Sequence, residues 1–140
     1  MMFVDASVIV AIIREEPGFE ELEKRIASAD GAFFVSPLVK FEASNALARA
    51  RSGATKRPSS NMLRQAQAAV DEFIEALGAE EISISPEIGN GAIEASCLYG
   101  KAVGHPAGLN LGDCFAYACA KACQVDLFYK GNDFAATDLA

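Results

Sequence analysis

Met1-Met2-Phe3-Val4-Asp5-Ala6-Ser7 forms a short apolar run that ends in a carboxylate, and it continues into the apolar stretch 8–13. This pattern predicts a buried strand that ends at Asp5 and is followed by a helix. A buried carboxylate is normally neutralised, paired or bound to a metal, and no Lys or Arg precedes Arg14. Asp5 therefore either caps the helix, with Ser7 as a second capping candidate, or faces a ligand site at the carboxyl end of its strand.

The length of 140 residues and the hydrophobic content of 51% predict one domain, residues 1–140, around one core. The apolar start has no basic flank and is too short for a signal peptide or a membrane span. We therefore expect a cytoplasmic protein with no membrane partner. The four cysteines have no CxxC spacing and the chain has one histidine, which speaks against a zinc site or a disulfide framework.

Apolar runs and helical periodicity alternate along the chain. After the first strand we expect strands over 32–35, 81–85 and 125–129. Helices are expected over 7–14, 19–28, 37–51, 60–77, 86–99 and 113–123, and loops over 52–60 and 100–110. Strands separated by helices predict an α/β fold, namely a three-layer α/β/α domain with a central parallel sheet of four to five strands.

Three further carboxylates have the same kind of position as Asp5. Glu42 lies early in the helix after the second strand, Asp113 at a helix start, and Asp133 just after the last strand. A parallel sheet brings such positions to one edge. Carboxylates crowded there repel each other unless a cation lies between them, and oxygen ligands without His or Cys favour Mg²⁺ or Mn²⁺. For Asp113 alone, ordinary helix capping is an equally good explanation.

Other catalytic motifs are missing from the sequence. His105 is the single histidine and lies in a glycine-rich loop, which disfavours a His-based acid–base mechanism. There is no P-loop, and Gly89-Asn90-Gly91 lacks the third glycine of a dinucleotide-binding motif. A metal that orients a phosphodiester and activates water needs no protein nucleophile, so metal-dependent hydrolysis agrees best with these residues.

The formal net charge of −7 would by itself disfavour nucleic acid as a partner. The charge is unevenly distributed, however, because five of the twelve Lys and Arg residues fall within positions 49–64, whereas 65–100 holds seven acidic residues and no basic one. Solvated surface is the simpler explanation for both regions.

Four segments together resemble a PIN domain of the VapC toxin type, in order and over essentially the whole chain. They are Phe3 to Ser7, Ser36 to Glu42, Leu109 to Ala118, and Gly131 to Phe134 with Thr137-Asp138. The resemblance implies a Mg²⁺- or Mn²⁺-dependent endoribonuclease that acts as the toxin of a type II toxin–antitoxin pair. It also implies a homodimer, an antitoxin protein as partner, and an RNA substrate, with tRNA among the candidates.

The same resemblance assigns roles to individual residues. Asp5 and Asp113 become the principal metal ligands, and Glu42 and Asp133 complete the catalytic acidic site. Ser7 matches the small hydroxyl residue beside the first Asp. Asp133 is preferred over Asp138 as the fourth acidic residue. Three residues are expected to support the acidic site, namely Ser7, Thr137 and Asp138. The candidate RNA contacts are Arg14, Arg49, Arg51, Lys56, Arg57 and Lys130.

Two other functions remain open at this point. One is a phosphatase whose strand-end Asp attacks phosphorus, although that chemistry requires a second carboxylate two residues on, where this chain has Ser7. The other is a non-catalytic PIN-like interaction module whose acidic pocket binds a partner's arginines.

Overall fold

The computed structural model describes residues 1–53 and 56–140, so that two positions of the expected loop 52–60 lie outside the described residues. The strands are β1 (Met2–Val4), β2 (Phe33–Val35), β3 (Glu80–Glu81) and β4 (Asp126–Phe128). The helices are α1 (Ala6–Ile13), α2 (Phe19–Ser28), α3 (Pro37–Ser52), α4 (Ser60–Leu77), α5 (Pro86–Tyr99) and α6 (Leu111–Cys123), with a 3₁₀ turn η1 (Lys101–Val103) between the last two. None of the helices in the described ranges is long and apolar enough to cross a membrane.

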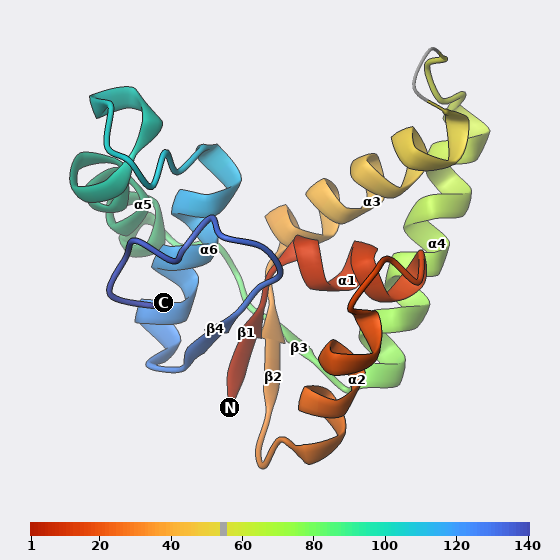
Figure 1. Ribbon diagram of the computed structural model, residues 1–140, viewed down its shortest axis with the longest axis horizontal. Coiled ribbons are helices and arrows are strands. Elements are labelled where there is room, and N and C mark those ends of the chain that lie inside the picture. Colours follow the sequence, from red (N-terminus) through yellow and green to blue (C-terminus); the bar gives the residue numbers. More distant parts are fainter. Residues whose placement is uncertain (54–55) are drawn as a thin grey trace.

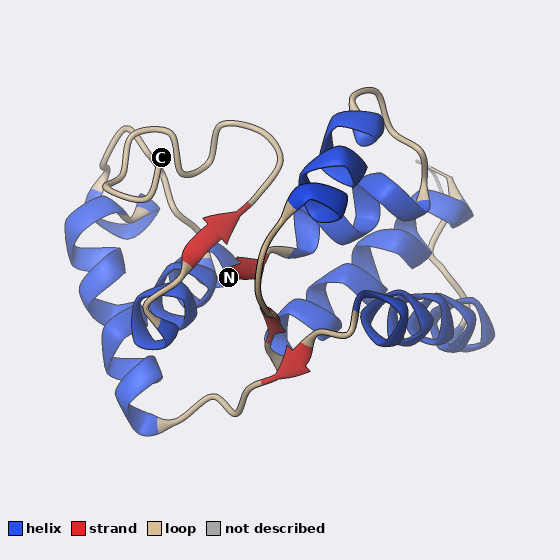
Figure 2. Ribbon diagram, turned by 90° about the horizontal axis from the view of Figure 1, so that it is seen from below, coloured by secondary structure: helices blue, strands red, loops and turns tan. Residues whose placement is uncertain are grey.

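The strands form one four-stranded sheet in the order β3-β2-β1-β4, and every neighbouring pair is parallel. Helices α1 to α4 lie on one side of the sheet, and α5 and α6 lie on the other (Figures 1 and 2). This arrangement confirms the predicted three-layer α/β fold with a parallel sheet.

Strand β1 lies inside the sheet, between β2 and β4. Phe3 and Val4 are fully buried, and the register places Phe3 beside Phe34 of β2 and Leu127 of β4. The β1–β4 hydrogen bonding extends one residue beyond the strand, because the backbone N–H of Asp5 donates to the carbonyl of Phe128 at 2.9 Å. The backbone of Asp5 is therefore fixed by the sheet itself.

Two predicted boundaries are wrong. The expected strand 81–85 is reduced to Glu80–Glu81, because Ser85 caps α5 through the N–H of Ile88 and the chain turns away from the sheet before it. Helix α6 begins at Leu111 and not at Asp113, since Asn110 is its N-cap. The starts of α3 and α5 agree with the predicted helices 37–51 and 86–99, and in both a serine cap, Ser36 or Ser85, is followed directly by proline.

Helices α3 and α4 pack against each other as a long antiparallel hairpin that extends away from the sheet (Figure 1). Arg51, Lys56 and Arg57 lie at or beyond the end of α3, near the tip of this hairpin, whereas Glu42 lies near its base. The basic region is therefore spread along the hairpin and is not concentrated at the edge of the sheet.

Candidate active site

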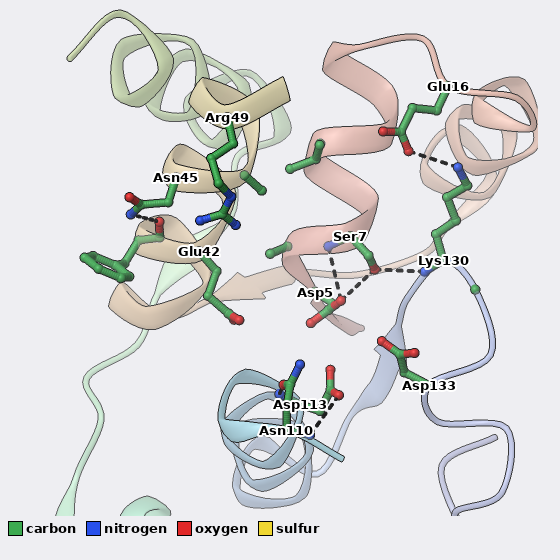
Figure 3. A pocket seen from close by; sticks show the side chains of 15 residues that line it. Asp5, Ser7, Glu16, Glu42, Asn45, Arg49, Asn110, Asp113, Lys130 and Asp133 are labelled. Atoms are coloured by element: carbon green, nitrogen blue, oxygen red, sulfur yellow. Dashed lines mark hydrogen bonds and ion pairs between the residues drawn. The ribbon is translucent and has the colours of Figure 1, made fainter. Parts of the chain in front are cut away.

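Residues from four separate segments line one open pocket of about 770 Å³ at the carboxyl ends of β1 and β4 (Figure 3). The polar residues that line it are Asp5, Ser7, Glu16, Glu42, Asn45, Arg49, Asn110, Asp113, Lys130 and Asp133. All four carboxylates that the sequence singled out are in this set. We call this hollow the acidic pocket.

Asp5 caps helix α1 and also lines the acidic pocket. It is the N-cap of α1, since its Oδ2 accepts hydrogen bonds from the backbone N–H of Ser7 at 3.1 Å and from Ser7 Oγ at 2.6 Å. Ser7 Oγ in turn accepts from the backbone N–H of Lys130 at 3.0 Å. The hydroxyl of Ser7 therefore fixes one oxygen of Asp5 and ties the segment after β4 to the start of α1.

Asp113 is held by a capping box at the start of α6. Its backbone N–H donates to Asn110 Oδ1 at 2.9 Å, and its Oδ2 accepts from the backbone N–H of Asn110 at 3.1 Å. The spacing Asn-x-x-Asp before an apolar run is a capping signal that was present in the sequence. Helix capping and a place in the acidic pocket are thus compatible for Asp113, as they are for Asp5.

Glu42 reaches the pocket from α3 and lies against α6. A Cβ atom added to Gly112 would overlap the carboxylate of Glu42, so this side chain occupies the space that the glycine leaves open. Gly112 is buried and directly precedes Asp113. The close approach of Glu42 to the first turn of α6 therefore depends on the absence of a side chain at position 112.

The electrostatics of the pocket reflect burial and crowding of like charges. Burial raises the pKa of Glu42 to about 7, and the neighbouring Asp5 and Asp113 add to this shift. Burial likewise raises the pKa of Asp113 to about 6, against the hydrogen bond from Asn110. The pKa of Asp5 is also raised by burial, although both hydrogen bonds from Ser7 oppose the shift. In the described part of the chain, no Lys or Arg forms an ion pair with these carboxylates or with Asp133.

The two cations that line the pocket lie on different elements. Lys130 Nζ pairs with Glu16 Oε1 at 3.0 Å, and Glu16 Oε2 pairs with Arg14 Nη1 at 3.0 Å. The hydrogen bond from Lys130 lowers the pKa of Glu16. Arg49 projects from α3 on the side of the pocket that carries Glu42 (Figure 3). Sequence reasoning missed Glu16, because nothing in the sequence relates position 16 to position 130.

Several predicted site residues lie elsewhere. Asp138 accepts hydrogen bonds from Tyr117 Oη at 2.7 Å and Lys121 Nζ at 2.5 Å, away from the acidic pocket, so it is not a candidate for the fourth acidic position. Thr137 is buried, and its hydroxyl donates to the carbonyl of Phe134. The predicted RNA contacts that do not line the pocket are Arg14, Arg51, Lys56 and Arg57.

The oxygen donors of the pocket fit a hard divalent cation. Within residues 1–53 and 56–140, no three metal-ligating side chains converge closely enough to enclose an ion. Mg²⁺ usually keeps several of its waters and is bound through one or two carboxylates together with substrate phosphates. An open pocket with four separate carboxylates, two of them fixed by hydrogen bonds from Ser7 and Asn110, agrees with this kind of binding.

Comparison with known proteins identifies the family. The family model of the PIN domain matches residues 2–139. The chain belongs to the PIN-domain family. It is 58% identical to a VapC ribonuclease of Rhizobium meliloti (strain 1021) over 141 residues, which cover 99% of each chain. It is 30% identical over 138 residues to Ribonuclease VapC42 of Mycobacterium tuberculosis (strain ATCC 25618 / H37Rv), and the match covers 99% of this chain and 96% of that one.

Two solved structures have a similar fold. VapC20 of Mycobacterium tuberculosis, described as a toxin that cleaves the sarcin–ricin loop, matches with a TM-score of 0.74 at 17% identity, over 100% of this chain and 97% of that one. A toxin–antitoxin complex from Klebsiella pneumoniae matches with a TM-score of 0.67 at 15% identity, over 99% of this chain and 93% of that one. The chain is thus a VapC-type PIN-domain ribonuclease, and the phosphatase alternative is not supported.

Proposed function

We propose that this VapC-type protein is a Mg²⁺- or Mn²⁺-dependent endoribonuclease and the toxin of a toxin–antitoxin pair. The observation that carries the proposal is the meeting of Asp5, Glu42, Asp113 and Asp133 in one pocket without a paired Lys or Arg among the described residues. Such a group of carboxylates repels itself and attracts a cation. A bound Mg²⁺ or Mn²⁺ would neutralise charge on the scissile phosphate and lower the pKa of an attacking water.

The residues of the chain itself have separable tasks in this proposal. Asp5 and Asp113 are the principal ligands, because their carboxylates are oriented by Ser7 and Asn110. Glu42 and Asp133 complete the negative site from the facing helix and the segment after β4. Lys130 and Arg49 lie at two sides of the pocket, where each can contact an RNA phosphate as the strand crosses the carboxylates.

The partners follow from the family. The Klebsiella pneumoniae neighbour is a toxin–antitoxin complex, and we propose that an antitoxin also silences this chain. A homodimer is proposed as well. Light scattering of the purified chain measures whether it is a homodimer. Co-purification with the protein encoded next to it, followed by light scattering of the complex, tests the antitoxin.

The decisive test is cleavage of a panel of structured RNAs, including tRNA and a sarcin–ricin loop fragment, with Mg²⁺, with Mn²⁺ and with EDTA. Asp5→Asn serves as the inactive variant, and Asp126→Asn is its matched control, since Asp126 is exposed and does not line the pocket. Cleavage that needs both a divalent ion and Asp5, and that survives in Asp126→Asn, supports the proposal. Absence of both cleavage and metal binding under every condition would instead favour the non-catalytic interaction module.

A further inference from the structure

Phe41 is an exposed aromatic residue at the edge of the acidic pocket. Its side chain is 66% exposed, and it is the only aromatic among the large hydrophobic residues that are exposed in the described ranges. It lines the acidic pocket and also a second, smaller hollow of about 280 Å³, whose lining includes Lys40, Ser44 and Gln67. Pro37 and Leu63 also line the smaller hollow, so the ring stands between the acidic pocket and a hollow of mixed polar and apolar lining.

Phe41 belongs to a stripe of three residues on one face of α3. Phe41, Asn45 and Arg49 are spaced four apart, which places them on successive turns of the same side of the helix, and all three line the acidic pocket. Asn45 Nδ2 donates to the carbonyl of Phe41 at 2.9 Å, which leaves Asn45 Oδ1 as an available acceptor. The stripe thus offers an aromatic face, an amide oxygen and a guanidinium beside Glu42.

This combination matches the parts of a nucleotide. Bases of single-stranded RNA stack on aromatic side chains, their edges accept and donate hydrogen bonds, and Arg contacts phosphate. We propose that Phe41 stacks on an unpaired base next to the scissile phosphate, with Asn45 facing the base edge and Arg49 the backbone. The inference rests on the proposed ribonuclease function and assigns a base-stacking role to one side chain of α3 beside the carboxylates.

A protein-docking role for Phe41 agrees less well with its surroundings. At the centre of a protein interface, a buried ring is usually surrounded by apolar side chains, and charged residues are depleted there. The other apolar side chains that line the acidic pocket are Ala6, Val10 and Ala46, which are small, and the remaining lining is charged, amide, hydroxyl or glycine. An isolated ring among charged groups is more typical of nucleic-acid binding, where stacking is combined with ionic contacts.

The test is the affinity of a fluorescent RNA oligonucleotide for the full chain, measured by anisotropy in EDTA so that cleavage does not interfere. We expect Phe41→Ala and Phe41→Leu each to bind an unpaired oligonucleotide roughly 5- to 100-fold more weakly, the range that one base–aromatic stack provides. Phe41→Tyr, which keeps the ring, should bind like the wild type. Val103→Ala is the control, since Val103 is also exposed but does not line either hollow.

A second oligonucleotide, paired throughout, separates stacking from other causes. Phe41→Ala and wild type should bind it equally weakly, since its bases are unavailable to the ring. Wild-type affinity in Phe41→Ala, or in Phe41→Leu, would overturn the stacking proposal while leaving the ribonuclease function intact. Cleavage by wild type in Mg²⁺ reports on that function separately, and absence of any RNA binding or cleavage by wild type would overturn both.

Discussion

Two hollows of similar size adjoin the start of α6 and differ in the side chains that line them. The acidic pocket measures about 770 Å³, and the second hollow, about 890 Å³, lies between α5, η1 and α6. We call the second hollow the apolar groove. Its lining includes Ile93 and Leu111, which are 65% and 70% exposed, and Asn110 lines both hollows.

The reactive site cannot be identified from the size of a hollow alone. In the acidic pocket, burial shifts the pKa values of three carboxylates, and hydrogen bonds fix two of them. The apolar groove has Lys101 as its one ionisable side chain apart from Cys114, and Lys101 is exposed.

The largest effect is expected from removing charge in the acidic pocket. Asp5→Asn and Asp113→Asn should each lower the cleavage rate at least about 10³-fold, as the loss of a principal electrostatic group in an active site commonly does. Both variants should fold, and relief of carboxylate repulsion should leave them as stable as the wild type or more stable. Ile93→Ser in the apolar groove should cleave at the wild-type rate. An equal fall in the cleavage rate of Ile93→Ser and Asp5→Asn would contradict the assignment of the acidic pocket as the reactive site.

A smaller loss is expected when Glu42 is displaced without changing its charge. In Gly112→Ala the new methyl group overlaps the carboxylate of Glu42, which is the free end of a flexible side chain and moves away. Cleavage should fall about 10- to 100-fold, while the free energy of unfolding changes by less than about 1 kcal/mol, since Ala also favours the helix.

Gly100→Ala is the comparison for this variant. There the added Cβ would overlap the backbone carbonyl of Ser96, which cannot move freely, so the variant should lose stability by about 1–3 kcal/mol and keep its activity per folded molecule. Urea titration and single-turnover cleavage of both variants measure the two quantities. A stable Gly112→Ala variant with full activity would show that the position of Glu42 is unimportant.

The pH dependence of stability should also distinguish the acidic pocket. The folded-state pKa values of Glu42, about 7, and Asp113, about 6, lie above those of an unfolded chain. The folded state therefore binds more protons between roughly pH 4 and 8, and without metal its stability rises as the pH falls through this window, by an amount on the order of 2 kcal/mol. Below about pH 4 the trend reverses, because the pKa values of Glu16 and Asp138 are lowered in the folded state.

Urea midpoints at pH 8 and pH 5.5 in EDTA test this expectation. Glu42→Gln should flatten the slope between these pH values, and Ile93→Ser should leave it unchanged. A wild-type midpoint that falls steadily from pH 8 to 5.5 would contradict the raised pKa values.

The smallest effect is expected at the tip of the α3–α4 hairpin. Arg51→Ala, Lys56→Ala and Arg57→Ala together should weaken RNA binding less than about 10-fold and reduce its salt dependence, because these residues lie outside the acidic pocket and can add only phosphate contacts. Anisotropy at three salt concentrations measures the slope. An unchanged slope would place the RNA away from the hairpin.

Most of the fold was predictable from local pattern. The Ser-Pro caps of α3 and α5, the glycine after α4 and the apolar stripe of α4 determine boundaries that the structure reproduces within a residue or two. The strand 81–85 was mispredicted because alternation alone does not reveal where a chain leaves the edge of a sheet. The predicted start of α6 at residue 113 is two residues too late, because Asn110 was not recognised as the N-cap of this helix.

The acidic pocket was only partly predictable. Strand ends and helix starts gave Asp5, Glu42, Asp113 and Asp133, which the structure brings into one pocket. Asp138 follows Asp133 closely in sequence, but its carboxylate accepts hydrogen bonds from Tyr117 and Lys121 of α6, outside the acidic pocket. Contacts such as the Glu16–Lys130 ion pair join positions that only the completed sheet brings together.

The parallel pairing of β1 with β4 has a consequence for synthesis of the protein. The first strand made, β1, gains its last neighbour only when β4, more than a hundred residues later, docks beside it. Asp113 and Asp133 lie in the last part of the chain, so an unfinished polypeptide on the ribosome lacks half of the acidic pocket. The acidic pocket therefore forms only once the segment that carries Asp133 has been made and β4 has docked beside β1.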